Sequence, residues 1–450
     1  MTTPLPDYSA VELARLLRDG EIGAEELTAA CLDRIAALEP GIKAWTFFDA
    51  DRALRAAGEA DSRRAKGEAL GVLHGLPVGI KDTYDTLDMP TEFGTPIHRG
   101  RQPSTDATMV DRLRRAGAII LGKTVTSEYA VYTAGPTRNP HDLTRTPGGS
   151  SSGSAAAVAS GMVPLSLATQ TNGSTIRPAS FCGVVGYKPG LGLLSRTGIL
   201  KQSDLLDQPG LMARTVADVA MLSAALGGAD AADHRTIGYP ALDLSSASTV
   251  QGRPPRLAFI RSPYWNRLDD DAAMGLEGFV AGLGGIIEEV ELPHEFDQAA
   301  SIHATIMGAD IAAAYADDYH RAKALMSDTL VTIIEKGALV SASTLAEAFT
   351  ARDRLLLRFT DIAAKYDAII TPAARGIAPK CEDGTGDPIM ATVWTLLGLP
   401  AISLPLLTGF ENMPLGVQLV SGQRDDRTLL RAAAWLDRHC RSSSFNTASA

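Results

Sequence analysis

The 450-residue chain is 45% hydrophobic and 21% charged, a composition typical of a large soluble globular protein. Its net charge of −10 argues against nonspecific binding to nucleic acid or to an acidic membrane surface. The start of the chain lacks the basic and apolar segments of a signal peptide, and the best candidate for a membrane span, Val393 to Leu407, is short and interrupted by glycine and proline. We therefore expect a cytoplasmic protein that binds neither nucleic acid nor membrane.

The cysteines and histidines show no pattern of a metal centre or a disulfide framework. The cysteines are scattered without a C-x-x-C pair, and no H-E-x-x-H or other ligand spacing occurs. We therefore expect reduced cysteines, no metal and no cofactor. The four cysteines are Cys31, Cys182, Cys381 and Cys440.

The first 60 residues are predicted to form a helical cover outside the core. Ser9 and Glu12 have the spacing of a capping box, and the leucines that follow form the apolar stripe of a first helix. A second helix is expected at 24–38, because Pro40 interrupts the backbone hydrogen bonding of a helix.

Strand and helix patterns then alternate along the chain. The segment 71–80 is β-like, 106–116 has helical spacing, and 118–122 has the composition of a short buried strand. Such alternation predicts an α/β fold with a central mixed, mostly parallel sheet that helices cover on both faces.

The rest of the chain continues this pattern without an internal repeat or a linker. We therefore expect a single domain over residues 1–450, with a surface loop at 241–254 and a frayed polar tail at 442–450. Later helices are expected at 215–220, 269–282, within 300–365, at 393–397 and at 428–439, and later strands at 257–260, 286–292, 367–372, 402–405 and 415–420.

Two loops rich in glycine and serine form the centre of the sequence. The first covers 147–154 and the second 169–178, and a small-residue helical segment and an apolar strand separate them. Glycine permits close approach to a ligand, and serine is a nucleophile when a base lies nearby. Upstream, Lys81 follows an apolar run, which indicates a buried lysine able to act as a neutral base.

These motifs together resemble the signature of the amidase signature family of serine hydrolases. The residues that carry the resemblance are Gly75 to Asp82, Gly148-Gly149-Ser150-Ser151, Asn172-Gly173-Ser174, Phe181-Cys182-Gly183 and Lys188-Pro189. The likeness covers nearly the whole chain. It implies the single-domain α/β fold of that family and hydrolysis of an amide C–N bond.

The resemblance also implies a role for each residue of the site. Ser174 corresponds to the nucleophile, Ser150 to the serine that relays its proton, and Lys81 to the base. The relay serine of the family follows a cis peptide, which corresponds here to the bond between Gly149 and Ser150. The implied oxyanion hole consists of the backbone N–H groups of Thr171, Asn172, Gly173 and Ser174.

The second loop departs from the commonest family pattern. Gln170 stands where many members have Asp, Asn172 where many have Gly, and Arg177 comes three positions after the nucleophile instead of two. This version resembles a malonamidase-like subgroup, in which the arginine holds a substrate carboxylate. Gln170 and Arg177 are therefore candidates for substrate binding. Alternatively, Arg177 only braces the loop through internal contacts.

We predict an amidase that converts a small-molecule amide to a carboxylate and ammonia or an amine, with a homodimer as the expected assembly. Two alternatives share the motifs: the A subunit of a tRNA-dependent glutamyl/aspartyl amidotransferase, and a non-catalytic scaffold. A third hypothesis takes Ser151 as the centre of a G-x-S-x-G nucleophile elbow with His320 or His439 as base. The polar segment before Gly149 argues against it, because that elbow requires a preceding strand.

Overall fold

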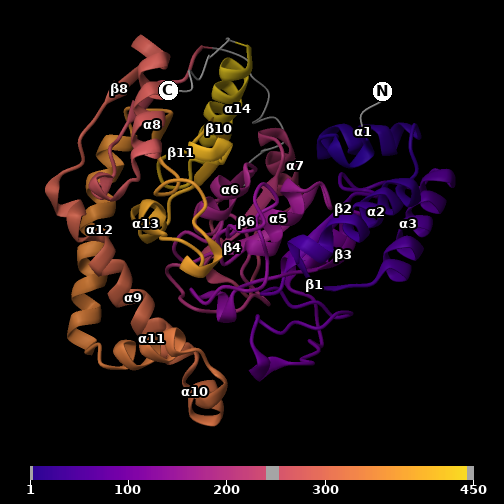
Figure 1. Cartoon of the computed structure of the whole chain (residues 1–450), viewed down its shortest axis with the longest axis horizontal. Coiled ribbons are helices and arrows are strands. Elements are labelled where there is room, and N and C mark those ends of the chain that lie inside the picture. Colours follow the sequence, from indigo (N-terminus) through magenta and orange to yellow (C-terminus); the bar gives the residue numbers. More distant parts are fainter. Residues whose placement is uncertain (1–3, 240–252, 443–450) are drawn as a thin grey trace.

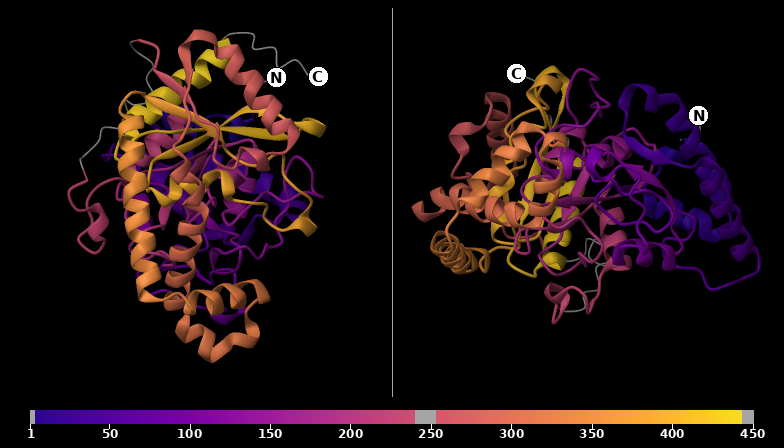
Figure 2. Two further views of the ribbon diagram at one scale, coloured as in Figure 1. Left: turned by 90° about the vertical axis from the view of Figure 1, so that its left-hand side faces the viewer. Right: turned by 90° about the horizontal axis from the view of Figure 1, so that it is seen from below.

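The computed structural model describes residues 4–239 and 253–442, which form one twisted sheet with helices on both sides (Figure 1, Figure 2). The strand order across the sheet is β1-β3-β2-β4-β6-β5-β10-β11-β9-β7-β8. The predicted α/β fold with a mixed sheet is therefore confirmed. The strands are β1 (Trp45–Phe48), β2 (Pro77–Lys81), β3 (Ile119–Thr124), β4 (Leu165–Gln170), β5 (Val185–Lys188), β6 (Gln208–Ala213), β7 (Leu257–Phe259), β8 (Ile287–Glu289), β9 (Ala368–Pro372), β10 (Ala401–Thr408) and β11 (Pro414–Val420).

The expectation that the sheet is mostly parallel is wrong. In the described part of the chain, β2 pairs in parallel with β3 and β4, and β7 with β8 and β9. The other pairings, which involve β1, β5, β6, β10 and β11, are antiparallel. Residues 409–413 connect β10 to β11, and a connection this short permits only an antiparallel hairpin. Parallel pairing in the described part of the chain is thus confined to two patches, one of which carries Lys81.

Apolar residues on both faces of the sheet are buried, as the prediction of two covered faces requires. In β9, Ile369 belongs to one apolar cluster, and its neighbours Ala368 and Ile370 belong to the other. In β7, Ala258 and Phe259 alternate between the same two clusters. Since successive strand residues point to opposite faces, each cluster lies on its own face of the sheet.

Different helices supply these two clusters. Helices near the N-terminus, together with α5, α7, α8 and α14, contribute to the first cluster, and α9, α11, α12 and α13 contribute to the second. The helices are α1 (Ala10–Asp19), α2 (Ala24–Ile42), α3 (Ala50–Ala65), α4 (Thr108–Arg115), α5 (Ser152–Ala159), α6 (Ile176–Cys182), α7 (Val216–Leu226), α8 (Asp270–Leu283), α9 (Ala299–Ala314), α10 (Ala316–Ala322), α11 (Asp328–Ala338), α12 (Ala342–Ala363), α13 (Ile389–Leu396) and α14 (Asp426–Ser442).

The N-terminal cover is helical as expected but differs in two details. The side chain of Ser9 accepts a hydrogen bond from the N–H of Glu12, so the predicted cap of α1 is present. Helix α2 continues through Pro40 instead of ending before it. The proline falls near the end of the helix, and the Glu39 carboxylate accepts hydrogen bonds from the N–H groups of Ala44 and Trp45, which follow the helix and would otherwise lack a partner. The cover also contributes β1 to the sheet.

Helices α9 to α12 lie at the end of the molecule opposite the N-terminal helices, and α10 and α11 project away from the sheet (Figure 1). Within the described residues, no single helix is long and apolar enough to cross a membrane; only α11 and α12 together pass that test, and they are bent by 97°. Of two predicted segments, the loop at 241–254 lies outside the described residues except for its last two positions, and the tail at 442–450 except for Ser442.

Candidate active site

Two neighbouring parallel strands bring the predicted base next to a relay serine. Lys81 is the last residue of β2, and Thr169 lies near the end of β4, with which β2 pairs. The carboxyl ends of parallel strands share one edge of the sheet, where ligands of α/β proteins usually bind. Lys81 Nζ lies 2.7 Å from Ser150 Oγ and 2.7 Å from Thr169 Oγ1. The predicted contact between base and relay is thus present.

The surroundings of Lys81 favour its neutral form. The side chain is fully buried, and burial lowers the pKa of Lys81 well below the ordinary value of a lysine, against an opposing effect of the Asp207 charge. Within the described residues, the hydrogen-bond partners of its Nζ are hydroxyl and carbonyl oxygens, and no carboxylate is among them. A neutral amine in this position can accept the proton of Ser150.

The loop that carries Ser150 has a backbone that requires glycine. The bond between Gly149 and Ser150 is cis, as the family resemblance predicts. Gly148 has a φ of 81°, and a Cβ at this position would lie 2.9 Å from the Cα of Pro178. A close approach of this kind accounts for the Gly-Gly pair that precedes the relay serine.

Ser174 lies next to this loop, but its hydroxyl forms no hydrogen bond with Ser150 among the described residues. Its carbonyl accepts a 3.4 Å hydrogen bond from the N–H of Ser151, which joins the two serine-rich loops. Ser174 is 9% exposed, so a small part of the residue remains accessible. Within the described residues no hydrogen bond connects its hydroxyl to Ser150. The first link of the predicted relay is therefore formed, and the second stays a prediction.

Ser151, the nucleophile of the elbow hypothesis, is fully buried and bonded. Its Oγ lies 3.2 Å from the carbonyl oxygen of Thr169 and 3.3 Å from the Thr169 nitrogen. The residues before it, 141–149, form no strand, so the strand that an elbow requires is missing. His320 and His439 lie on α10 and α14, helices at the periphery of the sheet.

The segment from Thr171 to Ser174 is anchored through its carbonyl groups. The oxygen of Thr171 is 2.9 Å from His303 Nε2, that of Asn172 accepts from Thr395 Oγ1 at 2.5 Å, and that of Gly173 accepts from the N–H of Arg177 at 3.0 Å. No hydrogen bond within the described residues uses the four N–H groups of this segment. Fixed backbone with free donors is what an oxyanion hole requires.

Gln170 makes contacts that shape this segment. Its Oε1 accepts hydrogen bonds of 2.8 and 3.0 Å from the N–H groups of Thr175 and Ile176, and its Nε2 donates to Thr395 Oγ1 at 2.9 Å. The side chain is 1% exposed. These bonds hold the first turn of α6 against the end of β4. Substrate binding by Gln170 therefore stays a prediction, while its contacts to the loop are observed.

Arg177 is also buried and directed inward. One nitrogen donates to the carbonyl oxygen of Gly149 at 2.6 Å, and another contacts the carbonyl oxygen of Gly386 and, at 3.4 Å, the hydroxyl of Thr385. Burial lowers the pKa of Arg177 to about 10, so the guanidinium remains charged. These contacts are those of the bracing alternative. Its Nε is buried and has no hydrogen-bond partner within the described residues.

Sequence reasoning missed the side chains that other elements bring to this loop. Asn172 donates to the hydroxyl of Tyr132 at 3.3 Å and accepts from Thr392 Oγ1 at 2.7 Å. His303 on α9 contacts the backbone carbonyl of Thr171, and Thr395 on α13 donates to that of Asn172, as described above. Residues this far apart in the sequence form no motif with a recognisable spacing. Thr169, in contrast, lies inside the second glycine- and serine-rich loop and could have been proposed as a site residue.

The structure adds little on metals and thiols. In residues 4–239 and 253–442, no group of three or more histidine, cysteine, aspartate or glutamate side chains is arranged to hold a metal ion. The four cysteines are free thiols, of which Cys31 and Cys182 are buried. Burial raises the pKa of both thiols, so neither is a ready nucleophile.

Comparison with known proteins places this site in a family. A family model described as Amidase matches residues 26–430, so the chain belongs to the amidase family. Among curated proteins, it is similar to the A subunit of the glutamyl-tRNA(Gln) amidotransferase from Acidothermus cellulolyticus. The two are 36% identical over 473 aligned residues, which cover 95% of this chain and 94% of that protein.

Solved structures agree with this assignment. One, described as an unexpected vestigial protein complex that reveals the evolutionary origins of an s-triazine catabolic enzyme, aligns with a TM-score of 0.90 and 28% identity over 96% of this chain and 98% of that one. The native peptide amidase from Stenotrophomonas maltophilia aligns with a TM-score of 0.83 and 29% identity over 97% and 98%. The family is thereby shown, but not the malonamidase-like subgroup.

Proposed function

We propose that this protein cleaves an amide C–N bond through an acyl-enzyme on Ser174, with Ser150 as the proton relay and Lys81 as the base. The observation that carries the proposal is the 2.7 Å contact between the buried Lys81 amine and the Ser150 hydroxyl. A lysine whose charged form is disfavoured, held on a serine beside a second serine, is equipped for general-base activation of a nucleophile.

The proposed reaction uses the two loops in turn. Lys81 takes the proton of Ser150, Ser150 takes that of Ser174, and Ser174 attacks the amide carbon. The N–H groups of residues 171–174 stabilise the negative oxygen of the tetrahedral intermediate. Ser150 then protonates the departing nitrogen, and a nucleophile releases the acyl group by the same relay.

Two settings fit this chemistry, and they differ in the fate of the nitrogen. The similarity to the A subunit of glutamyl-tRNA(Gln) amidotransferase, at 36% identity over almost the full length of both chains, favours a role in releasing ammonia for transfer to a tRNA-bound acid. In that setting B and C subunits and a tRNA are the partners. We place this setting first because these are curated relatives with the higher identity.

The second setting is a free-standing amidase for a small-molecule or peptide amide. The likeness to a peptide amidase of known structure favours it, as do the departures of this chain at Gln170, Asn172 and Arg177. Within this setting, the malonamidase-like hypothesis adds a carboxylate-bearing substrate held by Arg177. The observed contacts of Arg177 support bracing more than carboxylate binding.

A labelling experiment tests the shared chemistry, and an assay separates the settings. A fluorophosphonate probe followed by peptide mass spectrometry should modify Ser174 in the wild type and nothing in Ser174→Ala. Glutamine hydrolysis that rises upon addition of amidotransferase B and C subunits would support the first setting. Turnover of simple amides by the isolated chain, unchanged by those subunits, would support the second, and failure to label Ser174 would refute both.

A further inference from the structure

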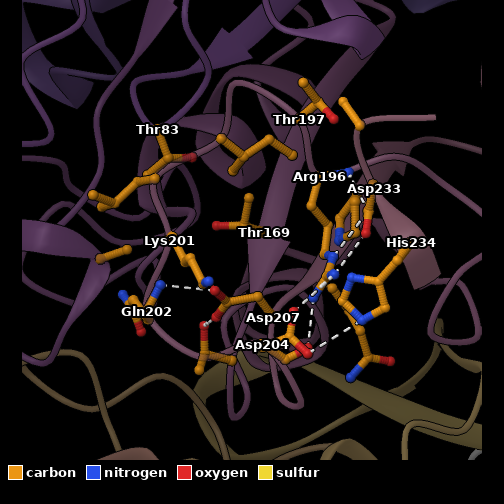
Figure 3. A pocket seen from close by; sticks show the side chains of 17 residues that line it. Thr83, Thr169, Arg196, Thr197, Lys201, Gln202, Asp204, Asp207, Asp233 and His234 are labelled. Carbon is orange, nitrogen blue, oxygen red and sulfur yellow. Dashed lines mark hydrogen bonds and ion pairs between the residues drawn. The ribbon is translucent and has the colours of Figure 1, made fainter. Parts of the chain in front are cut away.

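A polar cavity lies next to Thr169, the residue whose hydroxyl contacts the amine of Lys81. It has a volume of about 290 Å³ and is lined by Thr83, Thr169 and side chains of the segment 196–209 (Figure 3). Thr169 belongs to both sites, because its hydroxyl also contacts the amine of Lys81 at 2.7 Å. Asp207 faces this cavity beside Lys201 (Figure 3).

The Asp207 carboxylate connects the cavity wall to the oxyanion segment. One oxygen accepts a 2.7 Å hydrogen bond from the hydroxyl of Thr171. The other accepts bonds of 2.7 and 2.9 Å from the N–H groups of Gln202 and Ser203. A carboxylate with three donors is held firmly in one orientation, so it can fix the side chain of Thr171 in turn.

Thr171 is thereby held at two points. Asp207 binds its hydroxyl, and His303 on α9 lies 2.9 Å from its carbonyl oxygen. Burial lowers the pKa of His303 to about 4, so this imidazole is neutral and donates from one nitrogen. The two contacts restrict the peptide plane that presents the N–H of Asn172, one of the proposed oxyanion donors.

Asp207 also carries charge near the base. Its charge raises the pKa of Lys81, against the effect of burial. Burial raises the pKa of Asp207 itself to about 6, so its carboxylate is mostly ionised at neutral pH. The other charged or titratable groups around it are Arg196, Lys201, Asp204, Asp233 and His234 at the cavity and Tyr315 at the end of α9.

We propose that Asp207 is a positioning residue of the amide cleavage: it fixes the oxyanion segment through Thr171 and supplies the negative charge that stabilises Lys81 when this lysine carries the proton. The proposal rests on the proposed function. It assigns the two effects to two separable features of one carboxylate, a hydrogen bond and a charge.

Substitutions at Thr171 test the hydrogen bond. Thr171→Val removes the hydroxyl at nearly constant shape and should lower kcat about tenfold with little change in KM, because misplaced donors weaken transition-state stabilisation. Thr171→Ser keeps the hydroxyl and should restore most of this loss. Equal activity of the Val and Ser variants would overturn this half of the proposal.

Asp207→Asn tests the charge through the pH profile of kcat/KM. In the wild type, activity falls as the pH drops through the pKa of Lys81, because the base becomes protonated. Loss of the neighbouring negative charge lowers that pKa, so the acid limb should move to lower pH by roughly half a unit. An acid limb that stays in place while kcat falls would show that Asp207 acts only as a structural residue.

Asp204→Asn is the matched control. Asp204 lines the same cavity, but its side chain pairs with Arg196 and Arg235 and, among the described residues, forms no hydrogen bond with the oxyanion segment. This variant should keep the wild-type acid limb, and a shift equal to that of Asp207→Asn would overturn the assignment to Asp207.

Circular dichroism of every variant shows whether it folds, and fluorophosphonate labelling shows whether its nucleophile still reacts. An unlabelled wild type refutes the proposed function, whereas a labelled wild type with unaffected variants refutes only this inference.

Discussion

Two buried lysines lie on the neighbouring strands β2 and β3, near the carboxyl ends of both, and differ in the groups that surround their amines. Lys81 ends β2, and Lys123 lies on β3, where it pairs with Ile80 in the parallel register. Lys123 forms a 3.0 Å ion pair with Asp82 and donates to Thr91 Oγ1 at 2.6 Å and to the carbonyl of Tyr84 at 3.0 Å. The hydrogen-bond partners of Lys81 are hydroxyl and carbonyl oxygens alone.

The difference shows how partners decide the task of a buried amine. Burial lowers the pKa of both lysines, but at Lys123 the Asp82 carboxylate and its hydrogen bond oppose that shift. The ion-paired ammonium of Lys123 anchors the loop 82–91, and the ion pair disfavours the release of its proton. An amine that contacts two hydroxyls can exchange a proton with either, which is what a general base does.

The largest expected effect is the loss of catalysis in Lys81→Met. Removal of the base should lower kcat by about 10⁴-fold, in line with the loss of other members of catalytic relays. Stability should not fall, because the substitution also removes the cost of burying an amine without a carboxylate partner. Steady-state kinetics and thermal melts measure both quantities. An activity within tenfold of the wild type would remove Lys81 from the mechanism.

Lys123→Met should produce the converse result. The change leaves the Asp82 carboxylate buried without its counter-charge, which typically costs about 3–5 kcal/mol of stability. Urea denaturation should show this as a lower midpoint. The specific activity of the folded fraction should fall far less than in Lys81→Met. If Lys123→Met proved as stable as the wild type and catalytically dead, the contrast between the two lysines would be wrong.

Arg177→Ala tests whether a third buried cation acts on the substrate or on the loop. Because Arg177 bonds the carbonyl groups of Gly149 and Gly386, we expect acidic and neutral amides to lose kcat/KM alike, by about 2–3 kcal/mol for lost charge-assisted bonds. Parallel kinetics on two amides of similar size would show this. A loss confined to the carboxylate-bearing amide would instead support the malonamidase-like hypothesis.

Much of the contrast between the two lysines could not be predicted from the sequence. The apolar run before Lys81 predicted a buried base, and the resemblance to the amidase signature family implied the relay and its cis peptide, which is present. Lys123 lies one residue beyond the strand predicted at 118–122, with no motif to distinguish it. Its ion pair depends on the parallel pairing of β2 and β3, a long-range contact that local spacing does not encode.

Prediction of the fold succeeded where local patterns suffice and failed where pairing decides. Short apolar runs located β9 and β11, and the Ser9 cap located α1. The prediction of a mostly parallel sheet was wrong at its centre, because β5 and β6, which were not predicted as strands, pair antiparallel with their neighbours. For the same reason the site lacked Asp207 and His303, which reach Thr171 only through the folded sheet and α9.

The last effect we expect is the pH dependence of stability that Lys81 contributes. Its folded pKa lies below its unfolded value near 10.5, so between the two values the unfolded chain binds more protons than the folded one. Stability therefore rises with pH across this window, by at most about 1.4 kcal/mol per pH unit, and the contribution is lost as the pH falls through the folded pKa. The difference in unfolding free energy between the wild type and Lys81→Met isolates this contribution, since other titrating groups cancel. It should grow in favour of the wild type as the pH rises from 7 to 10.

The same difference measured for Lys123→Met should change less, because the ion pair with Asp82 holds the pKa of Lys123 closer to its unfolded value. A flat difference for Lys81→Met would mean that folding does not lower the pKa of this lysine, and the proposed base would then need another source for its neutral form.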